Sequence, residues 1–164
     1  MEAPLVPIHI ELRQSRPFPT FAEAAGVGLL RTAEIVRRAV ATAIGTHGIT
    51  YQQYNVLRIL RGAHPEPMPT LEIAARMIEA TPGITRLLDR LEAKQLVLRK
   101  RCERDRRQVH CWISERGLVL LAELDGPARG ALHEGFAGLG EKSTREIGEL
   151  LDRVRQSFRS SAAG

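Results

Sequence analysis

Apolar residues recur at three- and four-residue steps through much of the chain, the spacing that places them on one face of an α-helix. Residues 1–20 carry four prolines, which exclude a long helix, so we expect an extended arm there. Beyond the arm, the pattern predicts helices at Phe21 to Ile44, at Tyr51 to Arg61, from after Thr70 to about Ile78, at Glu115 to about Asp125, and from Ser143 or Thr144 onward. The expected fold class is therefore mainly α-helical.

Capping and breaking residues set the limits of these helices. Thr50 precedes one helix as a candidate N-cap and Ser114 opens another, whereas Gly45 and Gly48 end the first. Pro127 is expected either to kink its helix or to mark a restart. In the helix after Thr70, the buried stripe is expected to be Leu71, Ala74, Ala75 and Ile78.

A further predicted helix, from Thr81 to Leu91, has two distinct faces. Thr81 is expected to be its N-cap and Pro82 its first helical residue, a position where the missing N–H of proline has no cost. The apolar face consists of Ile84, Leu87, Leu88 and Leu91. At about 100° per residue, the opposite face carries Pro82, Arg86, Asp89 and Ala93, flanked by Thr85 and Arg90.

Two β-prone segments follow, Leu96 to Cys102 and Val109 to Ile113, and they flank a charged stretch at residues 103–108. This pattern predicts a β-hairpin with a charged tip. The order of helix, short helix, capped helix and hairpin is that of a winged helix-turn-helix, in which one helix enters the major groove of DNA.

The polar face of the capped helix predicts how DNA would be read. Thr85 and Arg86 are expected at base edges, because arginine can donate two hydrogen bonds to guanine. Thr81 and Arg90 suit phosphate contacts better. Asp89 has two interpretations, since it can accept a hydrogen bond from cytosine or pair with Arg86 or Arg90 one turn away.

The hairpin concentrates the positive charge of the chain. The whole chain has a net charge of +5, which favours a polyanionic partner. Between Arg99 and Arg107, two acidic residues stand against six basic ones, Arg99, Lys100, Arg101, Arg104, Arg106 and Arg107. Guanidinium groups at a hairpin tip can enter the narrow minor groove, and we expect Arg104, Arg106 and Arg107 to do so, with Asp105 holding one arginine in position.

Other classes of function find little support in the residues. The sequence contains none of the common catalytic or phosphate-binding motifs, so we expect neither an enzyme nor a cofactor. The two cysteines and the scattered histidines lack the spacing of a metal site, although Cys102 and Cys111 could face each other across the hairpin as a redox switch. No long apolar run or signal region is present, so we expect a cytoplasmic protein with no membrane contact.

Four segments carry a resemblance to a known family: Ile84-Thr85-Arg86-Leu87-Leu88-Asp89-Arg90-Leu91-Glu92, Leu96-Val97, Asp105-Arg106-Arg107 and Trp112-Ile113-Ser114-Glu115-Arg116-Gly117. With them, the chain from Gly48 to about Asp125 resembles the MarR family of multiple-antibiotic-resistance regulators. The resemblance implies groove contacts at Thr81, Thr85 and Arg86 and minor-groove contacts at the wing arginines, with Asp105 and Arg107 as the wing pair. It also implies a homodimer with interleaved terminal helices, and a ligand crevice beside each DNA-binding lobe.

This resemblance divides the chain into an N-terminal arm (1–20), a winged helix-turn-helix (49–114) and a helical dimerisation region (21–48 and 115–164). Two features depart from the family pattern. Gln95 stands where the family usually has glycine, so glutamine is expected to adopt a left-handed conformation. His110 and Trp112 share one face of a wing strand if Val109 and Cys111 face inward.

These observations predict a sequence-specific, double-stranded DNA-binding transcriptional regulator. We expect a repressor that binds a pseudopalindromic operator and is released by a small molecule or another signal. The alternative is a winged helix that binds a protein or RNA partner without sequence-specific DNA binding.

Overall fold

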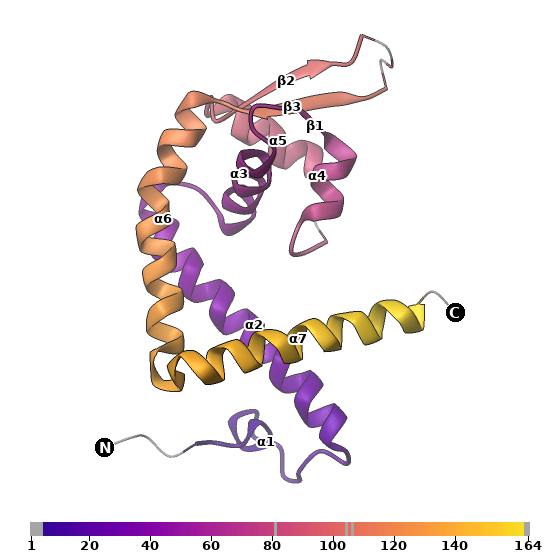
Figure 1. Cartoon of the computed structure of the whole chain (residues 1–164), viewed down its shortest axis with the longest axis vertical. Coiled ribbons are helices and arrows are strands. Elements are labelled where there is room, and N and C mark those ends of the chain that lie inside the picture. Colours follow the sequence, from indigo (N-terminus) through magenta and orange to yellow (C-terminus); the bar gives the residue numbers. More distant parts are fainter. Residues whose placement is uncertain (1–4, 81, 104, 106, 163–164) are drawn as a thin grey trace.

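The computed structural model describes residues 5–80, 82–103, 105 and 107–162. Figure 1 shows a lobe built from α3 to β3 at one end of α6, with α2 and α6 extending away from it and α7 running crosswise from the far end of α6. The expected fold, mainly helical with a small hairpin, is confirmed. In chain order the elements are α1 (Ile8–Glu11), α2 (Phe21–Ile44), the 3-10 helix η1 (Gly45–His47), α3 (Tyr51–Ala63), β1 (Met68–Pro69), α4 (Thr70–Arg76), α5 (Ile84–Ala93), β2 (Val97–Arg101), β3 (Val109–Ile113), α6 (Glu115–Phe136), the 3-10 helix η2 (Ala137–Leu139) and α7 (Gly140–Ala162).

The lobe starts at α3, which begins with the predicted cap. Thr50 Oγ1 accepts a hydrogen bond from the backbone N–H of Gln53 at 3.2 Å, and Gln53 Oε1 accepts one from the N–H of Thr50 at 3.1 Å. This reciprocal capping box satisfies two backbone donors that the first turn would otherwise leave unpaired. Behind it, α3 buries Tyr54, Leu57 and Leu60, as predicted.

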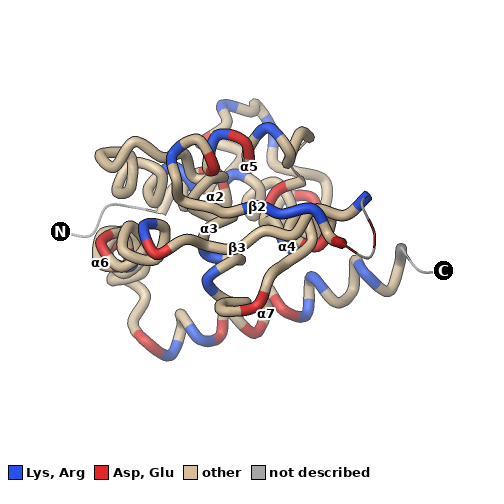
Figure 2. The backbone as a smooth tube through the Cα atoms, turned by 90° about the horizontal axis from the view of Figure 1, so that it is seen from above, with Lys and Arg blue, Asp and Glu red and all other residues tan. Residues whose placement is uncertain are grey.

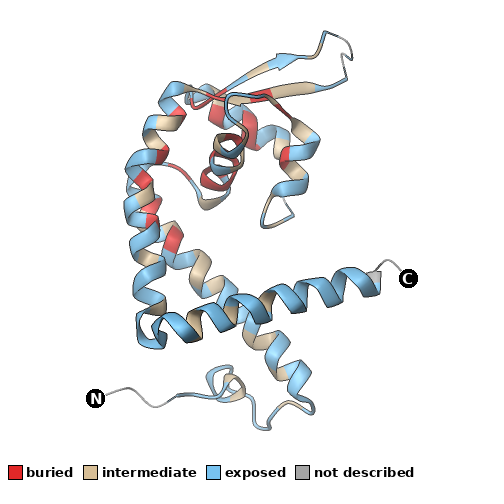
Figure 3. Cartoon of the chain, in the orientation of Figure 1, coloured by how far each residue is buried: buried red, intermediate tan, exposed pale blue. Residues whose placement is uncertain are grey.

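Side chains from every element of the lobe meet in one core. Those that are fully buried include Leu57 and Leu60 of α3, Ile73 of α4, Leu88 and Leu91 of α5, and Val97 and Cys111 of the strands. Ile44 of α2 and Leu121 and Leu124 of α6 complete the same cluster. Figure 3 shows that buried residues gather in the lobe and in the adjoining ends of α2 and α6. This core fixes the orientation of α5.

The short helix α4 differs from the prediction in its limits and in its buried face. It ends at Arg76, and its core residue is Ile73, whereas Leu71 of the expected stripe is 80% exposed and Ile78 is 65% exposed. The reason is the start of the helix, where the Thr70 hydroxyl donates to the Val109 carbonyl at 3.1 Å. That contact turns Ile73 toward the core. The spacing of apolar residues in so short a helix does not indicate which face is buried.

The sheet contains the predicted hairpin and one additional strand. β3 lies between β1 and β2 and is antiparallel to both, with Met68 opposite Cys111 and Arg99 opposite Cys111 on the other side. The two-residue strand β1, between α3 and α4, is not among the elements predicted from the sequence. Pairing with β3 therefore ties the start of α4 to the wing.

The arm and the C-terminal helices also show differences. The arm contains the four-residue helix α1, and Glu11 at its end accepts a hydrogen bond from Arg31 Nε of α2 at 2.8 Å. α6 continues through Pro127 without a restart, because Leu124 and Ala128 on either side of it are both buried. α7 begins at Gly140, before the predicted Ser143. Among the described residues, no helix is long and apolar enough to cross a membrane.

Candidate nucleic-acid interface

The start of α5 differs from the prediction. The helix begins at Ile84, and its N-cap is Gly83, whose φ of 86° lies in the left-handed region that glycine adopts without steric cost. Pro82 is therefore an exposed turn residue before the helix and not its first helical residue. Thr81, the predicted cap and phosphate contact, lies outside the described residues.

The two faces of α5 are those predicted. Leu87, Leu88 and Leu91 are buried, whereas Thr85 and Arg86 are exposed in the first turns. Within the described part of the chain, Arg86 forms no ion pair. The buried leucines thus anchor the helix from behind while the guanidinium group keeps its hydrogen-bond donors for a partner.

Arg99, one of the basic residues attributed to the wing, contacts α5. Its Nε and Nη2 donate to Glu92 Oε2 at 2.9 and 2.5 Å, and Nη2 also donates to Asp89 Oδ1 at 2.6 Å. Its side chain is 18% exposed, and the hydrogen bonds to Glu92 raise its pKa further. Asp89 therefore pairs with Arg99 and, among the described residues, forms no ion pair with Arg86 or Arg90, the pairing that was one of its two interpretations. This network attaches β2 to α5.

The described part of the wing tip is organised by Asp105. Its Oδ1 accepts from the backbone N–H of Arg107 at 3.0 Å and its Oδ2 accepts from the Gln108 side chain at 3.3 Å. Asp105 therefore shapes the turn through the backbone of Arg107, whose side chain remains exposed. Figure 2 shows the basic positions of β2 leading toward this tip. Arg104 and Arg106 lie outside the described residues.

The end of α5 confirms the expectation for Gln95. Its φ is 60°, its N–H donates to the Glu92 carbonyl at 2.8 Å, and the N–H of Leu96 donates to the Leu91 carbonyl at 3.0 Å. This is a Schellman motif formed without glycine. The Gln95 side chain also reaches α6, where Arg116 Nη1 donates to Gln95 Oε1 at 3.0 Å. Glutamine thus links the end of α5 to α6.

Two polar contacts that hold the turn before α5 were not predicted. Asn55, buried on α3, accepts a hydrogen bond from the backbone N–H of Ile78 through Oδ1 at 3.0 Å. Arg37 of α2 lies with Nε 3.4 Å from Glu79 Oε1. The contact of Asn55 could have been suspected from the sequence, because this asparagine stands among apolar residues of α3. The contact between Arg37 and Glu79 could not, because the two residues lie far apart in the sequence.

The outward face of β3 is confirmed, but the two cysteines do not lie face to face as the redox alternative required. His110 and Trp112 form an edge-on ring contact with centroids 6.2 Å apart. Cys111 is buried opposite Arg99, whereas Cys102 follows β2 and donates its backbone N–H to Gln108, so the two thiols do not face each other. Burial raises the pKa of the Cys111 thiol, which disfavours the reactive thiolate.

Comparisons with known proteins agree with this geometry. A sequence model described as "MarR family" matches residues 49–109. The HTH-type transcriptional regulator MhqR of Bacillus subtilis is 31% identical over 111 residues, which cover 68% of this chain and 75% of MhqR. The homoprotocatechuate degradative operon repressor of Escherichia coli is 25% identical over 132 residues, which cover 80% of this chain and 85% of that protein.

The solved structure of a MarR transcription factor from Planctomyces limnophilus superposes with a TM-score of 0.64 at 35% sequence identity. The match covers 85% of this chain and 99% of that one. It therefore includes both the winged lobe and most of the long helices.

Proposed function

Because this chain belongs to the MarR family and is thus a DNA-binding transcriptional regulator and not an enzyme, we propose that it is a repressor that reads its operator through α5 and the wing. The observation that carries this proposal is Arg86, which is exposed on the face of α5 opposite its buried leucines and forms no ion pair with any residue that the structure describes. Such a helix presents donors to a major groove while its other face remains in the core. One of the relatives is named a repressor, which supports repression and not activation as the proposed effect.

We assign each residue a role according to its place. Thr85 and Arg86 contact base edges, and Arg90, exposed one turn later, contacts phosphate. Pro82 lies in the turn before α5, and Thr81, the residue before it in the sequence, is assigned a phosphate contact. At the wing, Asp105 shapes the turn and the arginines enter the minor groove, namely Arg104, Arg106 and Arg107.

MarR regulators bind DNA as dimers, and the long helices of this chain leave a surface for a second copy. Phe21 and Leu30 of α2 are 97% and 74% exposed, and Leu150 and Phe158 of α7 are 57% and 74% exposed. A single chain leaves these large apolar groups in water, and an identical partner would cover them. Two-fold symmetry then requires a pseudopalindromic operator whose half-sites lie about one helical turn, ~34 Å, apart. A small molecule that changes this spacing would release the repressor.

The test is a selection of bound duplexes from a random pool, followed by titration of the selected operator. Arg86→Ala should weaken operator binding by about 1–3 kcal/mol and relax the preference at one base position, because it removes a base contact. Arg129→Ala, which removes an exposed arginine on α6, serves as the matched control and should leave both unchanged. If Arg86→Ala weakens binding to operator and to random DNA equally, Arg86 does not read bases.

The same selection separates this function from that of a winged helix with a protein or RNA partner. A DNA reader enriches one duplex sequence and shows a steep salt dependence of binding. Failure to enrich any sequence would contradict the proposed function.

A further inference from the structure

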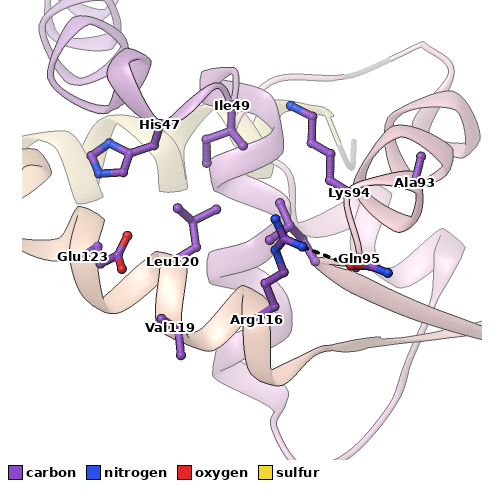
Figure 4. A pocket seen from close by; sticks show the side chains of 10 residues that line it. His47, Ile49, Ala93, Lys94, Gln95, Arg116, Val119, Leu120 and Glu123 are labelled. Carbon is purple, nitrogen blue, oxygen red and sulfur yellow. Dashed lines mark hydrogen bonds between the residues drawn. The ribbon is translucent and has the colours of Figure 1, made fainter.

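Both ends of α5, the proposed recognition helix, are attached to the long helices. Figure 4 shows the attachment at the C-terminal end, where Arg116 of α6 points toward Gln95 and donates to its Oε1 at 3.0 Å. That contact has a neutral acceptor. The attachment at the N-terminal end is of another kind, because there an ion pair from α2 reaches Glu79 in the turn that precedes the helix.

The turn between α4 and α5 has one attachment inside the lobe and one outside it. Figure 1 shows this turn on the side of the lobe that faces the long helices. Inside the lobe, the backbone N–H of Ile78 donates to Asn55 Oδ1 on α3 at 3.0 Å. Outside it, Glu79 Oε1 lies 3.4 Å from Arg37 Nε on α2. The second contact therefore joins the start of the recognition helix to a helix of the proposed dimer interface.

Arg37 is itself held in one orientation. Its Nε and Nη2 donate to the two carboxylate oxygens of Glu34 at 2.8 Å each, and Arg38 Nε donates to the same carboxylate at 2.6 Å. The hydrogen bonds from Arg37 and Arg38 lower the pKa of Glu34 to about 2, so this carboxylate is charged at neutral pH. A guanidinium group fixed by two parallel hydrogen bonds presents its charge to Glu79 at a fixed place on α2.

The position of Arg37 along α2 magnifies any change in this contact. Val40 and Ile44, near the C-terminal end of α2, are buried in the core of the lobe, whereas Phe21 at the other end is exposed and would meet the second copy. At ~1.5 Å per residue, Arg37 lies ~10 Å along the helix from Ile44, and Phe21 lies ~35 Å from it. A shift of ~1 Å between Arg37 and the lobe thus becomes ~3 Å at the partner contact, close to the ~3.4 Å rise of one base pair.

We propose that Arg37 is a positioning residue for DNA recognition, which fixes the lobe against α2 through Glu79 and thereby sets the distance between operator half-sites that the dimer accepts. The inference rests on the proposed function. Because both side chains are partly exposed, the pair contributes little to stability, and its main effect is on the geometry of the dimer. The side chains of α5 then determine which bases are read, and Arg37 determines how far apart the two sets of bases lie.

The first experiment titrates the selected operator and versions of it whose half-sites are moved together or apart by a single base pair. The unmodified chain should bind one spacing best. Arg37→Gln and Glu79→Gln should each reduce the affinity penalty for the displaced half-sites by ~3- to 5-fold, about what one partly exposed ion pair can contribute. The double variant should show no larger reduction than Glu79→Gln alone, because Arg37 acts through that residue. The preferred bases and the salt dependence should stay unchanged, since Arg37 is paired within the protein.

Arg38→Gln is the matched control. Arg38 is the next residue along α2 and donates to the same Glu34 carboxylate, but its side chain is 75% exposed, against 34% for Arg37. The control should keep the spacing preference of the unmodified chain, and thermal melting checks that every variant is folded. Three results would overturn the proposal: an unchanged penalty in Arg37→Gln, an equal loss of preference in Arg38→Gln, or a reduced salt slope in Arg37→Gln, which would place Arg37 on DNA.

The second experiment contains no DNA and separates this inference from the proposed function. A nitroxide label at Leu71→Cys, an 80% exposed position of the lobe, reports the distance between the two lobes of the dimer by pulsed electron paramagnetic resonance. The labelled chain also carries Cys102→Ser, and Cys111 is buried. Arg37→Gln should broaden the distance distribution, whereas Arg38→Gln should not.

An unchanged distribution in Arg37→Gln, or no measurable distance between two lobes, would overturn the inference even if the operator selection succeeds. A selection that enriches no duplex, beside a distribution that broadens, would contradict the proposed function and leave the positioning of the lobe by Arg37 in place.

Discussion

The winged lobe and the long helices bury their apolar side chains in different ways. In the lobe, Leu57, Leu88 and Leu91 are 0% exposed within a single chain. In the long helices, Leu30 and Phe158 are each 74% exposed, although they follow the same helical spacing (Figure 3). One chain therefore completes the core of the lobe, whereas the long helices leave an apolar surface exposed, which the proposed dimer would cover. The comparison predicts that the effects of mutations on stability depend on protein concentration in the long helices but not in the lobe.

The largest expected effect is in the core of the lobe. Leu88→Ala should lower the free energy of unfolding by about 2–5 kcal/mol, because it removes buried methyl groups and leaves a cavity. Leu71→Ala, at an 80% exposed position of the same lobe, should change it by little. Urea unfolding measures both, and the loss for Leu88→Ala should be the same at low and high protein concentration. A loss that varies with concentration would mean that the lobe core depends on the partner.

A carboxylate on the exposed face of α2 tests the other region. Leu30→Asp should raise the dissociation constant of the dimer by at least ~100-fold, since association would bury an unpaired charge. Sedimentation equilibrium measures the change, and circular dichroism should show that the lobe remains folded. Leu71→Asp, a matched control on an exposed leucine of the lobe, should leave the dimer intact. Dimers of unchanged stability in Leu30→Asp would remove Leu30 from the interface.

The same contrast explains which features of the fold were predictable from the sequence. The limits of α2, the Thr50 cap and the leucine face of α5 depend on neighbouring residues, and all three were predicted correctly. The buried residue of α4 depends on Thr70 reaching β3, which lies 39 positions away along the chain. The spacing of apolar residues also does not distinguish a helix face that packs within its own chain from one that would pack against a second copy.

The candidate interface follows the same rule. The exposure of Thr85 and Arg86 follows from the spacing of the leucines behind them and was predicted. The role of Arg99 was not, because Glu92 and Asp89 lie seven and ten positions before it and approach it only after the hairpin folds back. The start of α5 was misplaced because Thr81 and Pro82 resemble a helix start, and the left-handed conformation of Gly83 overrides them.

Arg99 also tests whether the wing is part of the rigid lobe. Arg99→Gln should weaken operator binding by about 1–2 kcal/mol, since the wing is no longer fixed to α5. It should not change the salt dependence, because Arg99 is paired within the protein. Arg107→Gln should instead reduce the salt slope by about one ion, as expected when one cation bound in the minor groove is lost. A salt titration of both variants on one operator gives the answer, and a reduced slope in Arg99→Gln would place Arg99 on DNA.

The smallest expected effect concerns the ion pair that joins the two regions. Arg61 of α3 donates to the two carboxylate oxygens of Asp125 on α6 at 2.9 and 3.0 Å, and both side chains are 35% exposed. After allowance for solvent screening, Asp125→Asn should therefore cost only about 0.5–1 kcal/mol at neutral pH. Arg61→Gln should cost a similar amount, and the double variant little more than either one alone.

The pH dependence of that cost identifies its source. The hydrogen bonds from Arg61 lower the pKa of Asp125 in the folded state below its unfolded value of about 3.9. The stabilisation is therefore complete above the unfolded pKa and is lost as the pH falls through the folded pKa. Urea unfolding of the unmodified chain and Asp125→Asn should differ at pH ~6 and converge in strong acid. A difference that persists in acid would show that packing, and not the ion pair, connects the lobe to α6 at this point.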